Sequence, residues 1–443
     1  MDRVITPGPL GGTVPAIASK SMAHRLLICA ALADKPTIIA CPTTSADIEA
    51  TASCLSALGA QVTRTETGYE VVPIHAPAAA ARLDCGESGS TLRFLLPLVA
   101  ALGAGVTLVG HGRLAQRPLS PLYEQLTDHG AVLGPQGAFP LSVSGRLAGG
   151  RFHLPGDVTS QFASGLLMAA PLLAEPLEVL VDEPIGSRPY LDLTIKALER
   201  FGVGVRISTG SMSGRRVTAF VPVNSACPAP PAPAVPPAYA SPGTVQVEGD
   251  WSNAAFWLAA GALAGDGVTV TGLADDSAQG DRAMAELLAR FGAHVERTAA
   301  GVTVRPAPLS ALTIDAGDIP DLVPPLACVA ALAQGTTRIG NAGRLRLKES
   351  DRLASVTAAL TALGAQVQAD DDGLTITGVD RLSSGTVDAA NDHRIAMMAA
   401  VAAIRADGPV TIRGAECVSK SYEGFFSDYQ LLGGKASAGE EVA

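Results

Sequence analysis

The sequence predicts an α/β protein built from six repeated βαβαββ-type units, three in each of two domains. Two observations predict this fold. A short polar segment followed by an apolar helix rich in Ala and Leu occurs six times, and each copy leads into a strand, a second helix and a hairpin. The helix starts are about 70 residues apart, except for one longer step with a Pro-rich insertion. They lie at Ser19, Ser88, Thr159, Trp251, Pro320 and Asp392.

The composition is that of a globular protein with ample core material. The chain has 443 residues, of which 47% are hydrophobic and 17% charged, and its net charge is −10. An acidic chain of this kind argues against nucleic acid as a partner. Its seven cysteines are scattered and contain no C-x-x-C, so we expect reduced thiols, and the apolar runs are too interrupted for a membrane span. We therefore expect a cytoplasmic protein.

The first helix of each unit is followed by a short β-branched strand. These strands are expected at residues 36–39, 106–109, 177–180, 268–270, 336–339 and 410–412. The second helix of a unit then ends at a glycine, which favours the left-handed conformation of a helix C-cap. The clearest cases are Gly59, Gly202, Gly292 and Gly364.

The sixth unit runs out of chain near residues 431–434, before its hairpin. The N-terminal strand at residues 4–7 could complete it, so the chain would cross between the domains twice. We expect one domain at residues 13–242 and the other at residues 1–12 and 243–443. The Pro-rich stretch at 227–242 is expected to be an extended, poorly ordered surface loop.

Charged and polar residues lie at the helix starts. Lys20 and Arg25 fall within the first two turns of a helix, where the macrodipole disfavours cations unless an anion is bound. If the two domains face each other, the six helix starts would line one cleft for ligands with several negative charges. The residues concerned are Lys20, Arg25, Arg93, Gln161, Asp321, His393 and Arg394.

Ten motifs in order along the chain resemble those of the EPSP synthases (3-phosphoshikimate 1-carboxyvinyltransferases) in the enolpyruvyl transferase family. They lie at residues 20–25 (KSMAHR), 86–93 (GESGSTLR), 117–119, 160–161, 187–190 (SRPY), 248–250, 319–321 (IPD), 348–352 (KESDR), 391–394 (NDHR) and Lys420. Each motif alone is weak evidence, but ten in order are not accidental. The resemblance implies the two-domain inverse α/β barrel, in agreement with the six units.

The resemblance also implies the reaction, which moves the enolpyruvyl group of phosphoenolpyruvate to the 5-hydroxyl of shikimate 3-phosphate and releases phosphate. It implies Asp321 as the base toward the hydroxyl and Glu349 as the acid at the methylene carbon, with Lys20 assisting both steps. Such chemistry needs no cofactor and no metal, and the sequence shows no metal-ligand spacing.

The ligand contacts are likewise implied by the resemblance. Those of phosphoenolpyruvate are Lys20, Gly89, Arg117, Gln161, Arg352, Arg394 and Lys420. Those of shikimate 3-phosphate are Lys20, Ser21, Arg25, Thr159, Ser160, Gln161, Ser187, Asp321, Arg344 and Lys348. Glyphosate would occupy the phosphoenolpyruvate site, against Gly89.

Other residues of the motifs have less specific interpretations. We expect Arg113, Arg188 and Arg346 to be surface cations, Asp351 and Asp392 to cap helices or orient arginines, and His393 to be structural; Tyr190 could bind substrate or pack. The chain departs from the family pattern at Ala18, Glu87, Thr159 and Arg344. Glu87 matters most, because it places an anion near an expected anion site.

Two alternative functions are considered. The related enzymes acting on UDP-N-acetylglucosamine carry Lys-Asn at the first motif and commonly a loop Cys, whereas this chain has Lys-Ser and a loop at residues 113–117 without Cys. A catalytically silent paralogue that binds another cyclic hydroxy acid is the second. We expect a monomer with small-molecule substrates and no membrane or nucleic-acid partner.

Overall fold

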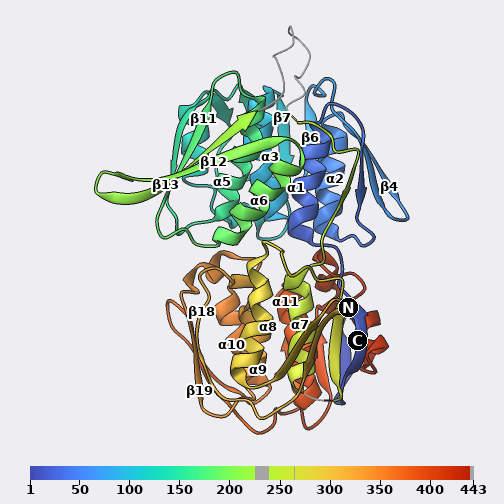
Figure 1. Cartoon of the computed structure of the whole chain (residues 1–443). Coiled ribbons are helices and arrows are strands. Elements are labelled where there is room, and N and C mark those ends of the chain that lie inside the picture. The colour runs from blue at the N-terminus through green and yellow to red at the C-terminus, as the bar shows by residue number, and fades with distance from the viewer. Residues whose placement is uncertain (225–238, 264, 440–443) are drawn as a thin grey trace. The chain divides into compact units, whose positions relative to one another are not determined.

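The computed structural model describes residues 1–224, 239–263 and 265–439, which divide into two compact units (Figure 1). The N-terminal unit is Lys20–Val247, and the C-terminal unit combines Met1–Ser19 with Glu248–Ala443. The units change over after Ser19 and before Glu248, whereas the expected domains changed over after residues 12 and 242. Within the described ranges, no helix is both long and apolar enough to cross a membrane.

Each unit contains three four-stranded sheets in its described part, and all six share one pairing pattern. The first two strands run parallel and the other neighbours antiparallel, which confirms the six βαβαββ-type repeats. The sheets of the N-terminal unit are β14 (Thr244–Gln246), β3 (Thr37–Ala40), β5 (Gly68–Val72), β4 (Gln61–Thr65); β6 (Ala81–Asp84), β7 (Val106–Val109), β9 (Leu141–Gly145), β8 (Ala131–Leu133); and β10 (Gly150–Leu154), β11 (Leu177–Asp182), β13 (Arg215–Asn224), β12 (Val203–Met212).

The C-terminal unit is completed by the first residues of the chain. Its sheets are β2 (Gly11–Pro15), β15 (Gly267–Thr271), β17 (Gly301–Arg305), β16 (His294–Thr298); β18 (Thr313–Asp315), β19 (Thr336–Gly340), β21 (Leu374–Thr377), β20 (Gln366–Ala369); and β22 (Gly385–Asp388), β23 (Val410–Arg413), β1 (Arg3–Thr6), β24 (Lys435–Ala438). The expected N-terminal strand therefore does complete the sixth sheet, between β23 and β24. The expectation that the chain runs out before a final strand is wrong, because β24 follows Gly434.

Two further strands come from the segments that connect the units. β2 pairs in parallel with β15, and β14 pairs in parallel with β3, so each takes the first position of a sheet whose other strands are distant in sequence. Each connecting segment thus supplies the strand that opens a repeat.

The first helix of each repeat is buried inside its unit, and the sheets lie around the helices (Figure 1). These helices are α1 (Lys20–Ala31), α3 (Gly89–Leu102), α5 (Ser160–Ala169), α7 (Trp251–Leu263), α9 (Val323–Ala330) and α11 (His393–Ala402). Small residues allow the close packing: a Cβ on Gly165 of α5 would lie 2.5 Å from the carbonyl oxygen of Arg93 on α3. The N-termini agree with the six predicted helix starts, within three residues.

The second helices are α2 (Ala46–Ala57), α4 (Leu122–Asp128), α6 (Arg188–Arg200), α8 (Ala283–Phe291), α10 (Arg352–Ala362) and α12 (Phe425–Leu431). Short 3₁₀ helices occur at η1 (Leu114–Gln116), η2 (Ala170–Leu172), η3 (Gly280–Arg282), η4 (Pro320–Leu322), η5 (Gly343–Leu347), η6 (Ala403–Arg405) and η7 (Ala415–Lys420). The predicted left-handed glycines after four second helices are confirmed, with φ of 110°, 78°, 114° and 80° at Gly59, Gly202, Gly292 and Gly364.

The end of the Pro-rich stretch is packed rather than loose. Residues 225–238 lie outside the described part, but Tyr239 is only 2% exposed, and its hydroxyl donates to the Met168 carbonyl at 2.6 Å. The Tyr239 ring also meets Phe201 edge-on, and the Ser241 amide donates to Asp34. The expectation of a poorly ordered surface loop is therefore wrong at this end of the stretch.

We expect Tyr239→Ala to destabilise the protein by about 3–5 kcal/mol, because it removes a buried aromatic ring. Tyr239→Phe keeps the ring and loses only the hydrogen bond to Met168, so we expect its free energy of unfolding to fall by about 1 kcal/mol. Urea denaturation followed by circular dichroism measures both. Equal losses for the two variants would mean that the hydroxyl, not the ring, holds this segment in place.

Candidate active site

Arg352 is the centre of the charged cluster in the C-terminal unit. It is the first residue of α10, and its side chain is 1% exposed. Its guanidinium donates to Asp392 (Nε to Oδ2, 2.8 Å), Asp321 (Nη1 to Oδ1, 2.8 Å) and Glu349 (Nη2 to Oε2, 2.7 Å). Burial alone would lower the pKa of Arg352, but these three carboxylates together raise it. One buried cation therefore holds both of the expected catalytic carboxylates.

Asp321 is held in addition by Arg394 and Lys348. Its Oδ2 accepts from Arg394 Nη2 at 3.0 Å, and its Oδ1 lies 3.5 Å from Lys348 Nζ. Burial would raise the pKa of Asp321, but the charges of Arg394, Lys348 and Arg352 outweigh burial and hold this pKa well below its usual value. Asp321 is therefore ionised and surrounded by cations.

Asp392 is the helix-capping and arginine-orienting residue that the sequence predicts. It is fully buried at the N-cap of α11, where it accepts from the Arg394 amide at 3.0 Å as well as from Arg352. Asp351 similarly caps α10 through the Ala354 amide and accepts from Arg346 at 2.9 Å. For both aspartates, the predicted structural role is confirmed.

The remaining predicted residues of the C-terminal unit lie around this cluster. Lys420, at the end of η7, donates to the carbonyl of Asn391, which immediately precedes Asp392. Arg344 lies in η5 and donates to the carbonyl of Gly317. Hydrogen bonds and ion pairs thus connect Asp321, Lys348, Glu349, Arg352 and Arg394 directly, whereas Lys420 and Arg344 contact neighbouring backbone.

In the N-terminal unit, the ends of α3 and α5 form a second polar cluster. Gln161 accepts from Arg93 Nη1 at 2.8 Å and donates to Ser90 Oγ at 2.9 Å. Gly89 opens α3, and a Cβ there would lie 2.6 Å from Arg117 Nη1 and 2.8 Å from Arg93 Nη1. Two guanidinium groups therefore lie directly against the first turn of a 14-residue helix, where backbone N–H groups also favour anions.

Lys20 and Arg25 occupy different positions on α1. Lys20 Nζ forms an ion pair with Asp47 Oδ2 at 2.8 Å, and each side chain is 15% exposed. Arg25 is buried: it donates to Thr194 Oγ1 at 2.8 Å and to the carbonyls of Ser21 and Tyr190 at 2.6 and 2.9 Å. Burial lowers the pKa of Arg25 to about 10. Arg25 thus joins α1 to α6, while Lys20 lies nearer the surface.

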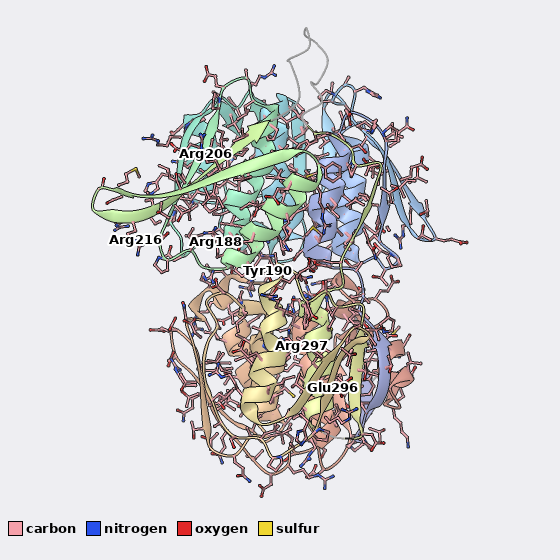
Figure 2. The ribbon with its side chains drawn as sticks, viewed as in Figure 1. Arg188, Tyr190, Arg206, Arg216, Glu296 and Arg297 are labelled. Atoms are coloured by element: carbon pink, nitrogen blue, oxygen red, sulfur yellow. The ribbon has the colours of Figure 1, made fainter. Side chains whose placement is uncertain are left out.

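Three hydroxyl residues lie at the starts of α5 and α6. Thr159 is the N-cap of α5 and accepts from the Gln161 amide, and Ser160 follows it, 8% exposed. Ser187 is the N-cap of α6 and has φ of 57°, a left-handed conformation that is uncommon outside glycine. Arg188 and Tyr190 follow on the same helix (Figure 2), and Arg188 pairs with Asp192. Backbone strain of this kind is often found where a side chain must meet a ligand.

A buried chain of hydrogen bonds supports the first turn of α3. His24 Nδ1 bonds to Thr51 Oγ1 at 2.7 Å, Thr51 to Thr91 at 2.7 Å, and Thr91 to Ser88, the N-cap of α3, at 2.8 Å. Burial and the nearby charges of Lys20 and Arg25 lower the pKa of His24 well below its usual value, so its ring is neutral. This chain fixes the helix start that carries Gly89.

The Glu87 carboxylate turns toward the loop after β7. A Cβ on Gly112 would lie 2.7 Å from it, so Glu87 packs against Gly112. Ala18, another departure from the family pattern, forms a β-bridge with Gly249 and is 6% exposed.

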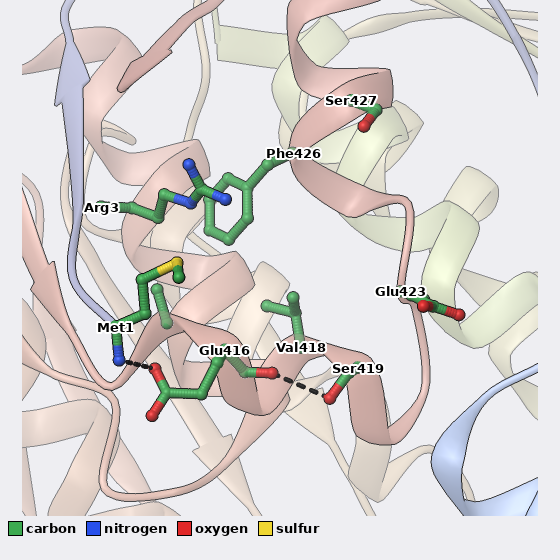
Figure 3. Close-up of a pocket in the computed structure, with 9 residues that line it drawn as sticks. Met1, Arg3, Glu416, Val418, Ser419, Glu423, Phe426 and Ser427 are labelled. Atoms are coloured by element: carbon green, nitrogen blue, oxygen red, sulfur yellow. Dashed lines mark hydrogen bonds and ion pairs between the residues drawn. The ribbon is translucent and has the colours of Figure 1, made fainter. Parts of the chain in front are cut away.

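A surface pocket of about 160 Å³ lies beside the N-terminal strand (Figure 3). It is lined by Arg3, whose guanidinium lies over the Phe426 ring, and by Met1, whose amino group pairs with Glu416. None of the predicted site residues lines it.

Sequence reasoning missed several carboxylates and hydroxyls of the two clusters. Asp47 lies in the first turn of α2, after the N-cap Ser45, and only the fold brings it to Lys20. Ser252 accepts from Arg394 at 2.7 Å, and burial together with the charge of Asp321 raises the pKa of Asp281 to about 7. No sequence pattern marked Asp47 or Asp281; Ser252 lies at a predicted helix start and could have been noticed.

The chain matches the family described as EPSP synthase (3-phosphoshikimate 1-carboxyvinyltransferase) over residues 4–429. It is 38% identical over 440 residues, with 97% of each chain covered, to the 3-phosphoshikimate 1-carboxyvinyltransferase of Clostridium kluyveri. It is 36% identical over 437 residues to the one of Methanocorpusculum labreanum, covering 98% of this chain and 99% of the relative. The solved structure of EPSP synthase from Acinetobacter baumannii is similar, with a TM-score of 0.75, 26% identity and coverage of 99% and 100%. The enolpyruvyl transferase NikO from Streptomyces tendae shares the fold, with a TM-score of 0.73 and 20% identity over 98% of each chain.

Proposed function

The chain belongs to the EPSP synthase (3-phosphoshikimate 1-carboxyvinyltransferase) family, and from this premise we propose which of its residues perform the reaction. The enzyme is a transferase of the shikimate pathway that moves the enolpyruvyl group of phosphoenolpyruvate to shikimate 3-phosphate. The acceptor is the 5-hydroxyl. Its oxygen adds to C2 of phosphoenolpyruvate while C3 gains a proton; the bond from C2 to the phosphate oxygen then breaks, and C3 loses a proton.

Asp321 is the base that takes the proton of the 5-hydroxyl. The observation that carries this assignment is its place beside Arg352, Arg394 and Lys348, which also attract the anionic groups of phosphoenolpyruvate. With these cations unliganded, Asp321 is a weak base, because they hold its pKa low. Anionic substrate would neutralise part of their charge and raise that pKa, so Asp321 would become a better base when its substrates are bound.

Glu349 is the acid that protonates C3. It shares Arg352 with Asp321, accepting from Nη2 while Asp321 accepts from Nη1, so the guanidinium holds both carboxyl groups at fixed positions. One must be ionised and the other protonated during addition. Lys20, paired with Asp47, assists by stabilising anionic oxygens and moving a proton.

Cationic side chains suit the phosphate and the carboxylate of phosphoenolpyruvate. Several arginines suit this ligand, because a planar guanidinium can bind two oxygens of a carboxylate or phosphate at once. The proposed contacts are Lys20, Gly89, Arg117, Gln161, Arg352, Arg394 and Lys420. Those of shikimate 3-phosphate are Lys20, Ser21, Arg25, Thr159, Ser160, Gln161, Ser187, Asp321, Arg344 and Lys348. Arg25 already donates to four protein oxygens, so its contribution is to hold α1 and α6 as well as ligand.

Phosphate release tests the function directly. With shikimate 3-phosphate and phosphoenolpyruvate the enzyme should release phosphate and form the enolpyruvyl ether, which mass spectrometry detects. UDP-N-acetylglucosamine in place of shikimate 3-phosphate should give no release above background. Release with the sugar nucleotide alone would favour the related transferase, and release with neither would favour a silent paralogue. Monomeric state and cytoplasmic location stay predictions, which light scattering and fractionation can check.

We expect Gly89→Ala to weaken the binding of phosphoenolpyruvate and, more strongly, the binding of glyphosate. The new methyl group would press on Arg117 and Arg93, whose guanidiniums lie 2.6–2.8 Å from its position. Overpacking of this kind costs about 1–3 kcal/mol, or about 5- to 150-fold in affinity. Glyphosate is the longer ligand, so its inhibition constant should rise more than the KM for phosphoenolpyruvate in steady-state assays. An equal rise in both constants would show that Gly89 does not discriminate by shape.

A further inference from the structure

The buried hydrogen-bond chain from His24 to Ser88 lies within the N-terminal unit, and its protons all point the same way. Thr91 Oγ1 donates to Ser88 Oγ at 2.8 Å, which uses the only proton of the Thr91 hydroxyl. In the 2.7 Å bond between Thr51 and Thr91, Thr51 must therefore be the donor. The Thr51 proton is then used as well, so the 2.7 Å bond between His24 Nδ1 and Thr51 Oγ1 is donated by the histidine.

The second ring nitrogen of His24 leads to the same direction by a separate argument. Nε2 is buried and has no hydrogen-bond partner in the described part of the chain. If the chain ran the other way, the one ring proton of neutral His24 would lie on Nε2, as a buried donor without an acceptor. For backbone groups, an unpaired buried N–H is rarer than an under-used acceptor. The same preference places the His24 proton on Nδ1, where Thr51 accepts it.

Ser88 is the last residue of this chain, and its own proton is left over. Its Oγ accepts from the hydroxyl of Thr91 at 2.8 Å and from the amide of Thr91 at 3.2 Å, so both lone pairs are used. Among the residues that the structure describes, none accepts the proton of the Ser88 hydroxyl. Ser88 is 1% exposed, so this proton is largely shielded from bulk water. A buried O–H group of this kind favours a ligand that can accept from it.

The surroundings of Ser88 indicate that this ligand is an anion. Ser88 is the N-cap of α3, and Gly89 opens the helix. A Cβ on Gly89 would lie 2.6 Å from Arg117 Nη1 and 2.8 Å from Arg93 Nη1. An anion at this helix start would meet guanidinium groups and backbone N–H groups together. The Ser88 proton adds a donor on the side of the helix axis.

We propose that Ser88 binds phosphoenolpyruvate by donating its hydroxyl proton to an anionic oxygen of this substrate, in the direction set by the chain that begins at His24. The inference rests on the proposed function, in which phosphoenolpyruvate lies against Gly89. Capping and donation are compatible, because the N-cap role uses the Ser88 oxygen as an acceptor and leaves its proton for the substrate.

Two substitutions of Ser88 separate donation from helix capping. Ser88→Ala and Ser88→Gly both remove the hydroxyl, but glycine is a much better N-cap than alanine. Both variants should raise the KM for phosphoenolpyruvate about tenfold or more, the scale of one lost hydrogen bond to a charged group. Because the lost contact is one of binding, kcat and the KM for shikimate 3-phosphate should change less than about threefold.

The comparison of the two variants decides between the roles. A raised KM in Ser88→Ala with a normal KM in Ser88→Gly would show that Ser88 acts only as a cap, and would overturn the proposal. A normal KM in both variants would overturn it as well. If Ser88→Ala does not fold, Ser88→Gly decides, since it retains most of the capping.

The direction of the chain has a spectroscopic readout of its own. In enzyme with isotope-labelled histidine, nitrogen NMR distinguishes a protonated from an unprotonated ring nitrogen, and His24→Asn identifies the His24 signals by their loss. We expect Nδ1 to carry the proton and Nε2 to carry none at neutral pH. A proton on Nε2 would reverse the chain and direct the Ser88 proton to Thr91, which would overturn the proposal.

Thr37→Val is the matched control. Thr37 is fully buried in the same unit, and its hydroxyl forms a bond of 2.7 Å with Ser241, so the variant also loses a buried hydroxyl. Its KM for phosphoenolpyruvate should equal that of wild type; a rise as large as in the Ser88 variants would assign their effect to general destabilisation. Wild-type enzyme without turnover would refute the proposed function itself, whereas normal wild-type turnover with unaffected Ser88 variants would refute only the role of Ser88.

Discussion

Asp321→Asn should lower kcat by about a hundredfold or more, the usual scale for loss of a general base. The amide has nearly the shape of the carboxylate but cannot take the proton of the 5-hydroxyl. Glu349→Gln should cause a loss of similar size, because it removes the proton donor for C3. Quenched-flow or steady-state phosphate release at saturating substrates measures both. Binding of shikimate 3-phosphate, followed by calorimetry, should suffer much less than turnover.

Two controls make the result interpretable. Asp371→Asn removes an exposed carboxylate of the same unit and should leave kcat unchanged. Asp321→Asn also deprives Arg352, Arg394 and Lys348 of a charge partner, so circular dichroism must confirm that the variant is folded at the assay temperature. A folded Asp321→Asn enzyme with near-normal kcat would assign the base to another group.

Arg352→Met should strongly lower the free energy of unfolding, on the same scale as Tyr239→Ala. The methionine fills much of the same space, but Asp321, Glu349 and Asp392 lose their shared cation, and Asp392 is fully buried. Removing one partner of a buried ion pair typically costs about 3–5 kcal/mol, because the remaining charge is left without compensation. Urea denaturation should show this loss. Turnover of the remaining folded protein should be negligible, since both catalytic carboxylates are misplaced.

Arg346→Met is the comparison that shows whether burial causes the effect. Arg346 pairs with Asp351 at 2.9 Å, but each side chain is 34% exposed. Exposed ion pairs contribute about 0–1 kcal/mol to the free energy of unfolding. A loss for Arg352→Met no larger than that for Arg346→Met would mean that the buried carboxylates can find other partners or protons.

The sequence allowed the repeated elements to be predicted because their signals are local. Ser88, Thr159 and Asp392 are N-caps whose side chains accept from the first turn of the helix, and the glycines that end second helices need a left-handed backbone. Such signals are visible within a few residues. The strands β2, β14 and β24 have no comparable signal. They are three to five residues long and form only because distant strands offer them an edge.

The residues of the site also fall into two groups, those that the sequence predicts and those that only the fold brings there. Motif residues such as Asp321 and Arg352 could be named from the resemblance, and the structure brings them into direct contact. The partners Asp47 and Asp281 could not be named, because isolated aspartates in a sequence carry no sign of what they will meet. For Arg25, the motif predicts a ligand contact but not how deeply the side chain is buried. Its burial depends on α6, which is more than 160 residues away along the chain.

Three of the sheets combine strands from distant parts of the chain, and this affects folding during biosynthesis. The N-terminal unit has all its strands once β14 leaves the ribosome, whereas β2 must wait for β15, and β1 for β23 and β24. At roughly 5–20 residues per second, the wait between β2 and β15 is about 12–50 s. During that time β1 and β2 have no partner strand, so their edges can pair with strands of other chains. β1 and β2 are therefore among the last strands to find their partners.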